Sequence, residues 1–501
     1  MTKNTLPFEL SSDAVAIWLN FLNQNNIAKS AVELNSAVKI LREHKSKSSE
    51  VFKALVLITP KVITTCNSIE LAFSTKNHSG TPSLKIIRLC IQLLRNMGLA
   101  FCKINDLKNV SKDEQNTSIY FALQLIGHSQ RLSAIFHETP SSSLWNEIGN
   151  IYHSALKEDS SQHKINHNIP TFKSQLTIES VLKRIILFNI SNPYLYSAKQ
   201  IKELFLIISM LADKLVLNNI TTSSINTFYW DSNSRNAPCA INSILQDQQL
   251  VTTINTEDVI STIQSNNFVC NLDPDALFNI IDHLSGYQSV INNPIPSAPA
   301  ISHLLIGFDN ISEYLTKVST LKKIQKLSTQ ITPLDTLENT KIEDMDVTSN
   351  PQSKNTSSTN LEFLSKAKAV KSLQVNSKNL VIAETSYIEC NIGDIALFCY
   401  ADLTNKIGII RQIKITNISK TVHILIEEIS GTPSTLQLSK TPSQISEHEI
   451  IVIDAPMTQR VLLPYLHKLS NGGKLSCVAD KKISLESLID YSPFFSLYQT
   501  S

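Results

Sequence analysis

The sequence predicts an α+β protein with more than one domain, in which a large all-α N-terminal body is followed by a small antiparallel β-barrel. Over roughly the first 325 residues, apolar side chains recur every three or four positions, which is the period of amphipathic helices. After residue 360 they alternate with polar side chains, which is the period of strands. A chain of 501 residues also exceeds the roughly 250–300 residues that one core usually serves, so we expect at least two domains.

The change of pattern sets the predicted domain boundaries. Residues 1–328 are predicted to form the helical domain, as a bundle or a solenoid-like stack. Residues 329–360 are polar and poor in large apolar side chains, so we expect a flexible linker there. Residues 361–501 are predicted to form the β-barrel and a C-terminal extension of it.

Capping residues and apolar faces place the helices. Ser11 offers a cap before the first helix. Asp273 offers a cap for the helix predicted over 274–284, and Pro274 suits its first position. Pro60 is expected at a helix start or a bend. The stretch Leu84–Lys103 is apolar on most faces, so we expect it in the middle of the bundle. The predicted helices span about residues 14–22, 28–43, 84–103, 116–137, 143–158, 177–189, 197–217, 255–267 and 274–284.

A further amphipathic helix is predicted over 314–327, with an apolar spine and several lysines outside it. We interpret it as the last helix of the helical domain; membrane or partner binding is the alternative. Six strands are predicted beyond the linker, bounded by Gly, Pro and Asn turns. They span residues 380–386, 395–400, 407–416, 421–430, 435–438 and 449–454.

Composition excludes several classes of function. The formal charge of +2 predicts no nucleic-acid partner, because a nearly neutral chain exerts little electrostatic pull on phosphate backbones. No stretch approaches the ~20 uninterrupted apolar residues of a membrane span, so we expect no transmembrane segment. The N-terminus lacks the pattern of a secretory signal, and the eight cysteines form no C-x-x-C pair. These features predict a cytoplasmic protein with reduced thiols.

Chemistry-bearing residues are sparse. The sequence holds no nucleophile elbow, P-loop, dinucleotide fingerprint or zinc-protease motif, so we expect no catalytic residues. His163 and His167 have ligand-like spacing, with His153 nearby. A zinc site needs three or four ligands, and we expect solvated loop histidines and no metal.

Several patches resemble a known family. The run from Asn391 to Pro433 (NIGDIALFCYADLTNKIGIIRQIKIT…VHILIEEISGTP) is similar to the second half of a PilZ domain in certain bacterial cyclic-di-GMP effector proteins. The helical region of that group carries motifs similar to Lys85–Asn96, to Ala100–Cys102 and to the turn Asn192–Ser197. The stretch Leu462–Phe495 is similar to its C-terminal pattern. The resemblance therefore covers most of the chain in patches and implies a PilZ-like barrel.

The ligand motifs of that family are incomplete in this chain. A PilZ domain holds cyclic-di-GMP with R-x-x-x-R before the barrel and [D/N]-x-S-x-x-G on the first strand, because arginine forks onto guanine and phosphate. Residues 365–380 contain no arginine, and neither register of the second motif fits. In the segment that the resemblance points to, the candidates for ligand contact are lysines and two small polar residues. Lysine offers positive charge but lacks the planar guanidinium of arginine. These candidate ligand-binding residues are Lys366, Lys368, Lys371, Asn376 and Ser377.

The resemblance implies a non-catalytic bacterial signalling or adaptor protein, with cyclic-di-GMP as a regulatory ligand and no other cofactor. The missing arginines favour a degenerate barrel that acts through protein–protein contacts, with the helical domain contacting a protein partner. Two alternatives stay open, namely a structural scaffold unrelated to nucleotide signalling and an enzyme without a recognised motif.

Overall fold

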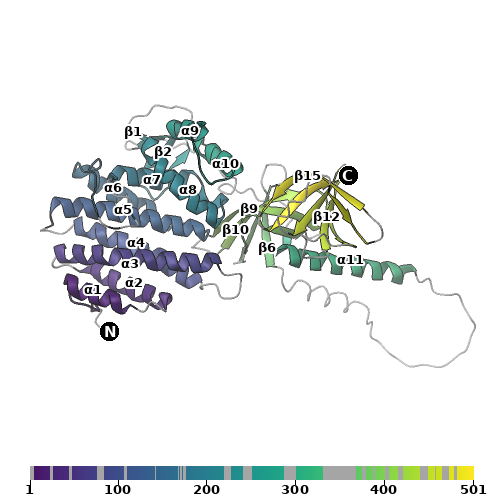
Figure 1. Cartoon of the computed structure of the whole chain (residues 1–501), viewed down its shortest axis with the longest axis horizontal. Coiled ribbons are helices and arrows are strands. Elements are labelled where there is room, and N and C mark those ends of the chain that lie inside the picture. Colours follow the sequence, from purple (N-terminus) through teal and green to yellow (C-terminus); the bar gives the residue numbers. More distant parts are fainter. Residues whose placement is uncertain are drawn as a thin grey trace, which may run out of the picture. The chain divides into compact units, whose positions relative to one another are not determined.

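The protein forms two compact units, Met1–Ser289 and Val290–Ser501 (Figure 1). The computed structural model describes residues 5–22, 26–44, 48–75, 84–105, 110–141, 143–167, 169, 172, 176–218, 227–240, 251–286, 301–330, 368–374, 380–386, 390–400, 405–415, 421–439, 449–456, 458–464, 473–478, 482–492 and 494–500.

The first unit is built from antiparallel helices lying side by side (Figure 1). Helix α4 packs against α2, α3 and α5, and its residues Ile87, Leu93 and Met97 are fully buried. This confirms the prediction that this helix lies in the middle of the bundle. The helices are α1 (Ser12–Phe21), α2 (Ile27–Glu43), α3 (Ser48–Thr75), α4 (Leu84–Asn105), α5 (Lys112–Ile135), α6 (Leu144–Lys157), α7 (Ile178–Ile190), α8 (Ala198–Leu211), α9 (Glu257–Gln264) and α10 (Pro274–Leu284).

Side-chain caps begin several of these helices. Ser11 Oγ accepts from Ala14 N at the start of α1, and Asp273 Oδ1 accepts from Ala276 N at 2.8 Å at the start of α10. Both caps confirm the sequence prediction. Pro60 lies inside α3, so of the two predicted positions the helix start is wrong. Helix α3 is long and apolar enough over Ser48–Ala72 to cross a membrane, but more than half of that stretch is buried inside the unit.

The prediction of an all-α body is wrong, because the first unit also carries a small antiparallel sheet. Its strands pair in the order β1-β4-β2-β3. The sequence does not indicate these strands, because they are short and follow the helices without a long alternating pattern. Their bounds are β1 (Val216–Asn218), β2 (Thr227–Asp231), β3 (Cys239–Ala240) and β4 (Val251–Asn255).

The second unit contains a closed antiparallel barrel of six strands, paired in the order β10-β7-β6-β5-β8-β9. Alternate residues of its strands, including Phe398, Ile413 and Ile424, form one buried apolar cluster, as the period of two requires. The strands are β5 (Ile301–Ile306), β6 (Lys368–Gln374), β7 (Leu380–Ser386), β8 (Ile395–Tyr400), β9 (Asn405–Ile415) and β10 (Thr421–Ile429).

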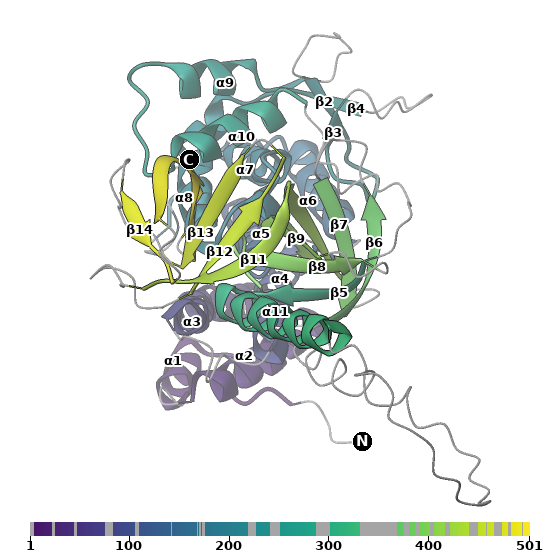
Figure 2. The same cartoon turned by 90° about the vertical axis from the view of Figure 1, so that its right-hand side faces the viewer.

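The sequence boundary at residue 328 separates elements that the structure groups together. Strand β5 pairs with β6 and β8, and helix α11 (Phe308–Gln330) packs against β5 and β11 (Figure 2). Ile311 and Leu315 of α11 share a buried cluster with barrel residues such as Leu397. The helix predicted as the last of the helical domain therefore belongs to the second unit. Nearly all of the predicted linker 329–360 lies outside the described residues.

The predicted C-terminal extension forms a second sheet of six strands, in the order β11-β12-β13-β16-β15-β14. Two of its strands, β11 and β12, were predicted as part of the barrel. Phe495 and Tyr498 are buried, so the aromatic end of the chain packs into this sheet. The strands are β11 (Thr432–Gln437), β12 (Glu449–Asp454), β13 (Gln459–Pro464), β14 (Lys474–Ser476), β15 (Lys482–Tyr491) and β16 (Phe495–Thr500).

Candidate functional site

Two of the residues predicted to bind a ligand, Lys368 and Lys371, lie on strand β6. Lys368 is paired with Leu304 of β5, and Lys371 is paired with Glu384 of β7. Both lysines are thus on a strand enclosed by barrel strands on either side. The other predicted residues, Lys366, Asn376 and Ser377, lie outside the described residues.

Arg411 on β9 is one of only two arginines after residue 360. Its Nε donates to Glu427 Oε2 of β10 at 2.7 Å, and its Nη2 donates to Asp490 Oδ2 of β15. Burial lowers the pKa of Arg411, but Asp490 and Glu427 outweigh it and leave the pKa above its ordinary value. The guanidinium therefore joins the barrel to the second sheet and is not poised to contact a guanine.

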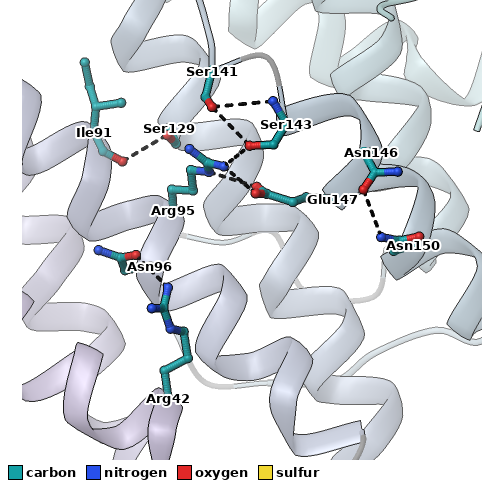
Figure 3. Close-up of polar contacts among 10 residues, drawn as sticks. All are labelled: Arg42, Ile91, Arg95, Asn96, Ser129, Ser141, Ser143, Asn146, Glu147 and Asn150. Carbon is teal, nitrogen blue, oxygen red and sulfur yellow. Dashed lines mark hydrogen bonds and ion pairs between the residues drawn. The ribbon is translucent and has the colours of Figure 1, made fainter. Parts of the chain in front are cut away.

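In the first unit, α4 holds the α5–α6 connection with two arginines seven residues apart, which places them on one helix face. Arg88 Nε donates to Glu138 Oε1 at 2.5 Å. Arg95 forks onto Glu147 of α6, with Nε donating to Oε2 at 2.8 Å and Nη2 donating to Oε1 (Figure 3). The same Nη2 donates to Ser143 Oγ at 2.6 Å. A bidentate fork fixes both partners in orientation as well as distance.

Neutral contacts extend this seam to the neighbouring helices. Arg42 Nη1 of α2 donates to Asn96 Oδ1 at 3.1 Å (Figure 3). Asn96 Nδ2 in turn donates to Asn35 Oδ1 at 3.0 Å. Ser129 Oγ of α5 donates to the Ile91 carbonyl at 3.0 Å (Figure 3). Because each of these side chains has a protein partner, we interpret the seam as a clamp that fixes helix positions.

A second polar network crosses the interior of the first unit. Arg184 Nη2 of α7 donates to Gln124 Oε1 at 2.7 Å, and Gln124 Nε2 donates to Tyr120 OH at 2.7 Å. Tyr120 OH lies 3.3 Å from His167 Nε2. Burial raises the pKa of Tyr120 to about 12, so the phenol stays protonated at neutral pH. The prediction of solvated histidines is wrong for His167, which also contacts aromatic rings, whereas His163 is exposed.

An ionic cluster lies beside this network. Glu70 of α3 is buried and accepts from Arg131 of α5, with Nη2 at 2.7 Å from Oε2. Lys202 of α8 lies 3.0 Å from the other Glu70 oxygen. The guanidinium carbons of Arg131 and Arg184 lie 5.7 and 4.8 Å from the centroid of the Phe205 ring. Sequence reasoning missed this cluster, because its members come from four helices and share no motif.

His153 contacts the turn that follows strand β2 of the first unit's small sheet. Its Nε2 lies 2.9 Å from Ser232 Oγ, and Ser232 is buried. Gly149 of α6 lets the Ser232 backbone approach closely, since a Cβ built at this glycine would lie 1.7 Å from the Ser232 carbonyl oxygen. In the described part of the chain, no three His, Cys, Asp or Glu side chains group as metal ligands would. The serine–histidine contact is best explained as docking of the sheet onto α6.

Most of the first unit matches a known family model. Residues 13–222 match the family model of the N-terminal domain of the cyclic-di-GMP receptor FimW, which covers less than half of the chain. No curated protein and no solved structure matches the chain. The matched stretch contains α4 with its clamp and the network around Arg184.

Proposed function

We propose that this protein is a non-catalytic cytoplasmic signalling receptor that responds to cyclic-di-GMP and acts on a protein partner. The observation that carries the proposal is the match of residues 13–222 to the N-terminal domain of a cyclic-di-GMP receptor. The closed antiparallel barrel that follows it supports a PilZ-like second unit. The partner would contact the helical unit.

The ligand would lie along β6, where Lys368 and Lys371 are placed, together with Lys366, Asn376 and Ser377. Lysine ammonium groups can meet the two phosphates of cyclic-di-GMP but cannot form the planar fork that guanine recognition uses. We therefore expect weaker binding than an R-x-x-x-R receptor would show. Since β6 is enclosed by β5 and β7, a ligand there would bear directly on the barrel wall.

A ligand-independent adaptor is the second candidate. It is favoured by Arg411, whose guanidinium is held by two carboxylates. In this version the barrel is degenerate and serves only as a protein-binding module.

Calorimetric titration of the full chain with cyclic-di-GMP separates the two candidates. The receptor proposal predicts saturable heat that is lost or weakened at least about tenfold when Lys366, Lys368 and Lys371 are changed to Ala. A control that changes Lys474 and Lys482 to Ala, in the second sheet of the same unit, should bind as the parent does. Unchanged heat in the β6 variant would show that the ligand binds elsewhere than at β6. Absence of heat in the parent protein would rule out the receptor and favour the ligand-independent adaptor.

A further inference from the structure

Arg184 is a buried arginine that differs from four others of the protein in the kind of acceptor it contacts. Arg88, Arg95, Arg131 and Arg411 each donate to at least one carboxylate. Arg184 is only 7% exposed, and in the part of the chain that the structure describes its guanidinium donates to the neutral amide oxygen of Gln124. The interior guanidinium is therefore the one without an opposite charge among these five.

Only part of the Arg184 guanidinium is hydrogen-bonded among the described atoms. Its Nη2 donates to Gln124, whereas its buried Nε has no hydrogen-bond partner among the described atoms. In Arg95 the same two nitrogens, Nε and Nη2, hold a carboxylate. A buried cation without a counter-charge costs several kcal/mol, and a buried donor without an acceptor adds to that cost. Burial accordingly lowers the pKa of Arg184 to about 10.

Positive charge exceeds negative charge around Phe205. Arg131 and Lys202 share the single carboxylate of Glu70, and Arg184 lies over the same Phe205 ring as Arg131. His128, whose ring centroid lies 5.4 Å from that of Phe205, supplies no further cation near neutral pH. Burial holds the pKa of His128 well below its ordinary value, and Arg131 and Arg184 lower it further. Among the described residues of this cluster, three cations therefore accompany one carboxylate, which leaves an excess of two positive charges.

Access to the cluster comes from one end. The Lys202 side chain is 34% exposed, so the cluster reaches the surface of the first unit there. On the α5 side the packing is close, since a Cβ built at Gly127 would lie 3.3 Å from Arg184 Nη2. A small residue at this position lets the guanidinium lie against the α5 backbone.

We propose that Arg184, Arg131 and Lys202 form a binding site for the phosphate group of a small ligand in the first unit. A guanidinium fork and an ammonium point charge are the groups that bind phosphate oxygens in proteins. The phosphate could come from inorganic phosphate or from a nucleotide such as cyclic-di-GMP. The site is separate from the lysines on β6, and its existence does not depend on the proposed function.

The test follows thermal unfolding of the full chain by tryptophan fluorescence, in potassium phosphate and in potassium chloride of equal ionic strength. All three tryptophans, Trp18, Trp145 and Trp230, lie in the first unit and report on it alone. The wild type should unfold about 5 °C higher in phosphate well above its dissociation constant. Arg184→Met should lose the part of this rise that comes from binding and keep only the general effect of phosphate exclusion. It should unfold no lower than the wild type in chloride, because an apolar side chain replaces an uncompensated charge.

Arg235→Met, which removes an exposed arginine of the same unit, is the matched control and should keep the full rise. Phosphate also stabilises proteins in general by exclusion from their surface, and that effect is equal in all variants. An equal rise in wild type and Arg184→Met would overturn the proposal, as would the absence of any rise in the wild type. The absence of a rise in the wild type overturns the proposal even if Arg184→Met does not fold.

A parallel series with cyclic-di-GMP in chloride identifies the source of the phosphate. A dinucleotide-dependent rise that Arg184→Met loses supports the site with the nucleotide as ligand. An Arg184-dependent rise in phosphate alone supports the site with free phosphate as its ligand, and the proposed receptor function, whose site lies on β6 in the other unit, is then decided by calorimetry. A dinucleotide-dependent rise that Arg184→Met keeps, without a phosphate effect, overturns the site and leaves the receptor function standing.

Discussion

Removing the fork between Arg95 and Glu147 tests how far α4 stabilises the first unit. The perturbation is a double-mutant cycle of Arg95→Met and Glu147→Gln, which isolates the pairwise energy from the effect of each substitution. The exposed fractions of the two side chains are 24% and 18%. The pair is therefore neither fully solvated nor fully buried.

The expected magnitude follows from that burial. Exposed ion pairs contribute about 0.2–1 kcal/mol, whereas breaking a buried pair costs about 3–5 kcal/mol. With two parallel hydrogen bonds and a third to Ser143, we expect each single change to lower the free energy of unfolding by about 2 kcal/mol. The coupling energy should be about 1.5 kcal/mol, because the partner left behind can still reach water.

Urea unfolding of the first unit, followed by tryptophan fluorescence, measures these energies. Lys29 and Glu33 of α2 provide a matched control in the same unit, since they are 3.9 Å apart with side chains 63% and 41% exposed. Their coupling should stay below about 0.5 kcal/mol. A coupling for Arg95 and Glu147 no larger than that of the control would refute the view that α4 clamps the α5–α6 connection.

Two further outcomes follow from single residues. Gly149→Ala should lower the free energy of unfolding by more than about 3 kcal/mol, because the new methyl group meets the Ser232 carbonyl; an unchanged urea midpoint would contradict this close approach. Burial lowers the pKa of His137 to about 4, whereas an unfolded histidine titrates near 6.5, so the unfolded state binds more protons between these values. The stability from this group is fully present above about pH 6.5 and is lost as the pH falls toward 4, by at most about 3 kcal/mol. Unfolding titrations at several pH values should show this loss, and His137→Asn, which tolerates the left-handed backbone there (φ 54°), should reduce it.

The elements with a strong local pattern could be predicted from the sequence. Strands β7 and β8 have the bounds that alternation predicted, and Asp273 caps α10 as its position before Pro274 indicated. Strand β5 could not be assigned, because it precedes a helix and its partners β6 and β8 begin more than 60 residues later. Pairing over such a distance leaves no local signature, and the domain boundary was misplaced for the same reason.

The candidate sites were predictable only in part. A family resemblance pointed to Lys368 and Lys371 but implied a segment before the barrel, whereas the structure places both on the barrel strand β6. Arg184 was visible in the sequence only as a charge that interrupts the apolar stretch from Val181 to Asn189. Whether such a charge has a carboxylate partner depends on residues of three other helices. The spacing of residues along the chain gives no information about that partner.

The central claim is that the full chain binds cyclic-di-GMP, and equilibrium binding of that dinucleotide tests it most directly. Calorimetry with the intact protein at physiological salt should give a saturable isotherm with a dissociation constant in the micromolar range, and GMP at the same concentration should give none. A flat isotherm for cyclic-di-GMP up to about 500 μM would contradict the receptor function and leave an adaptor whose barrel binds protein alone.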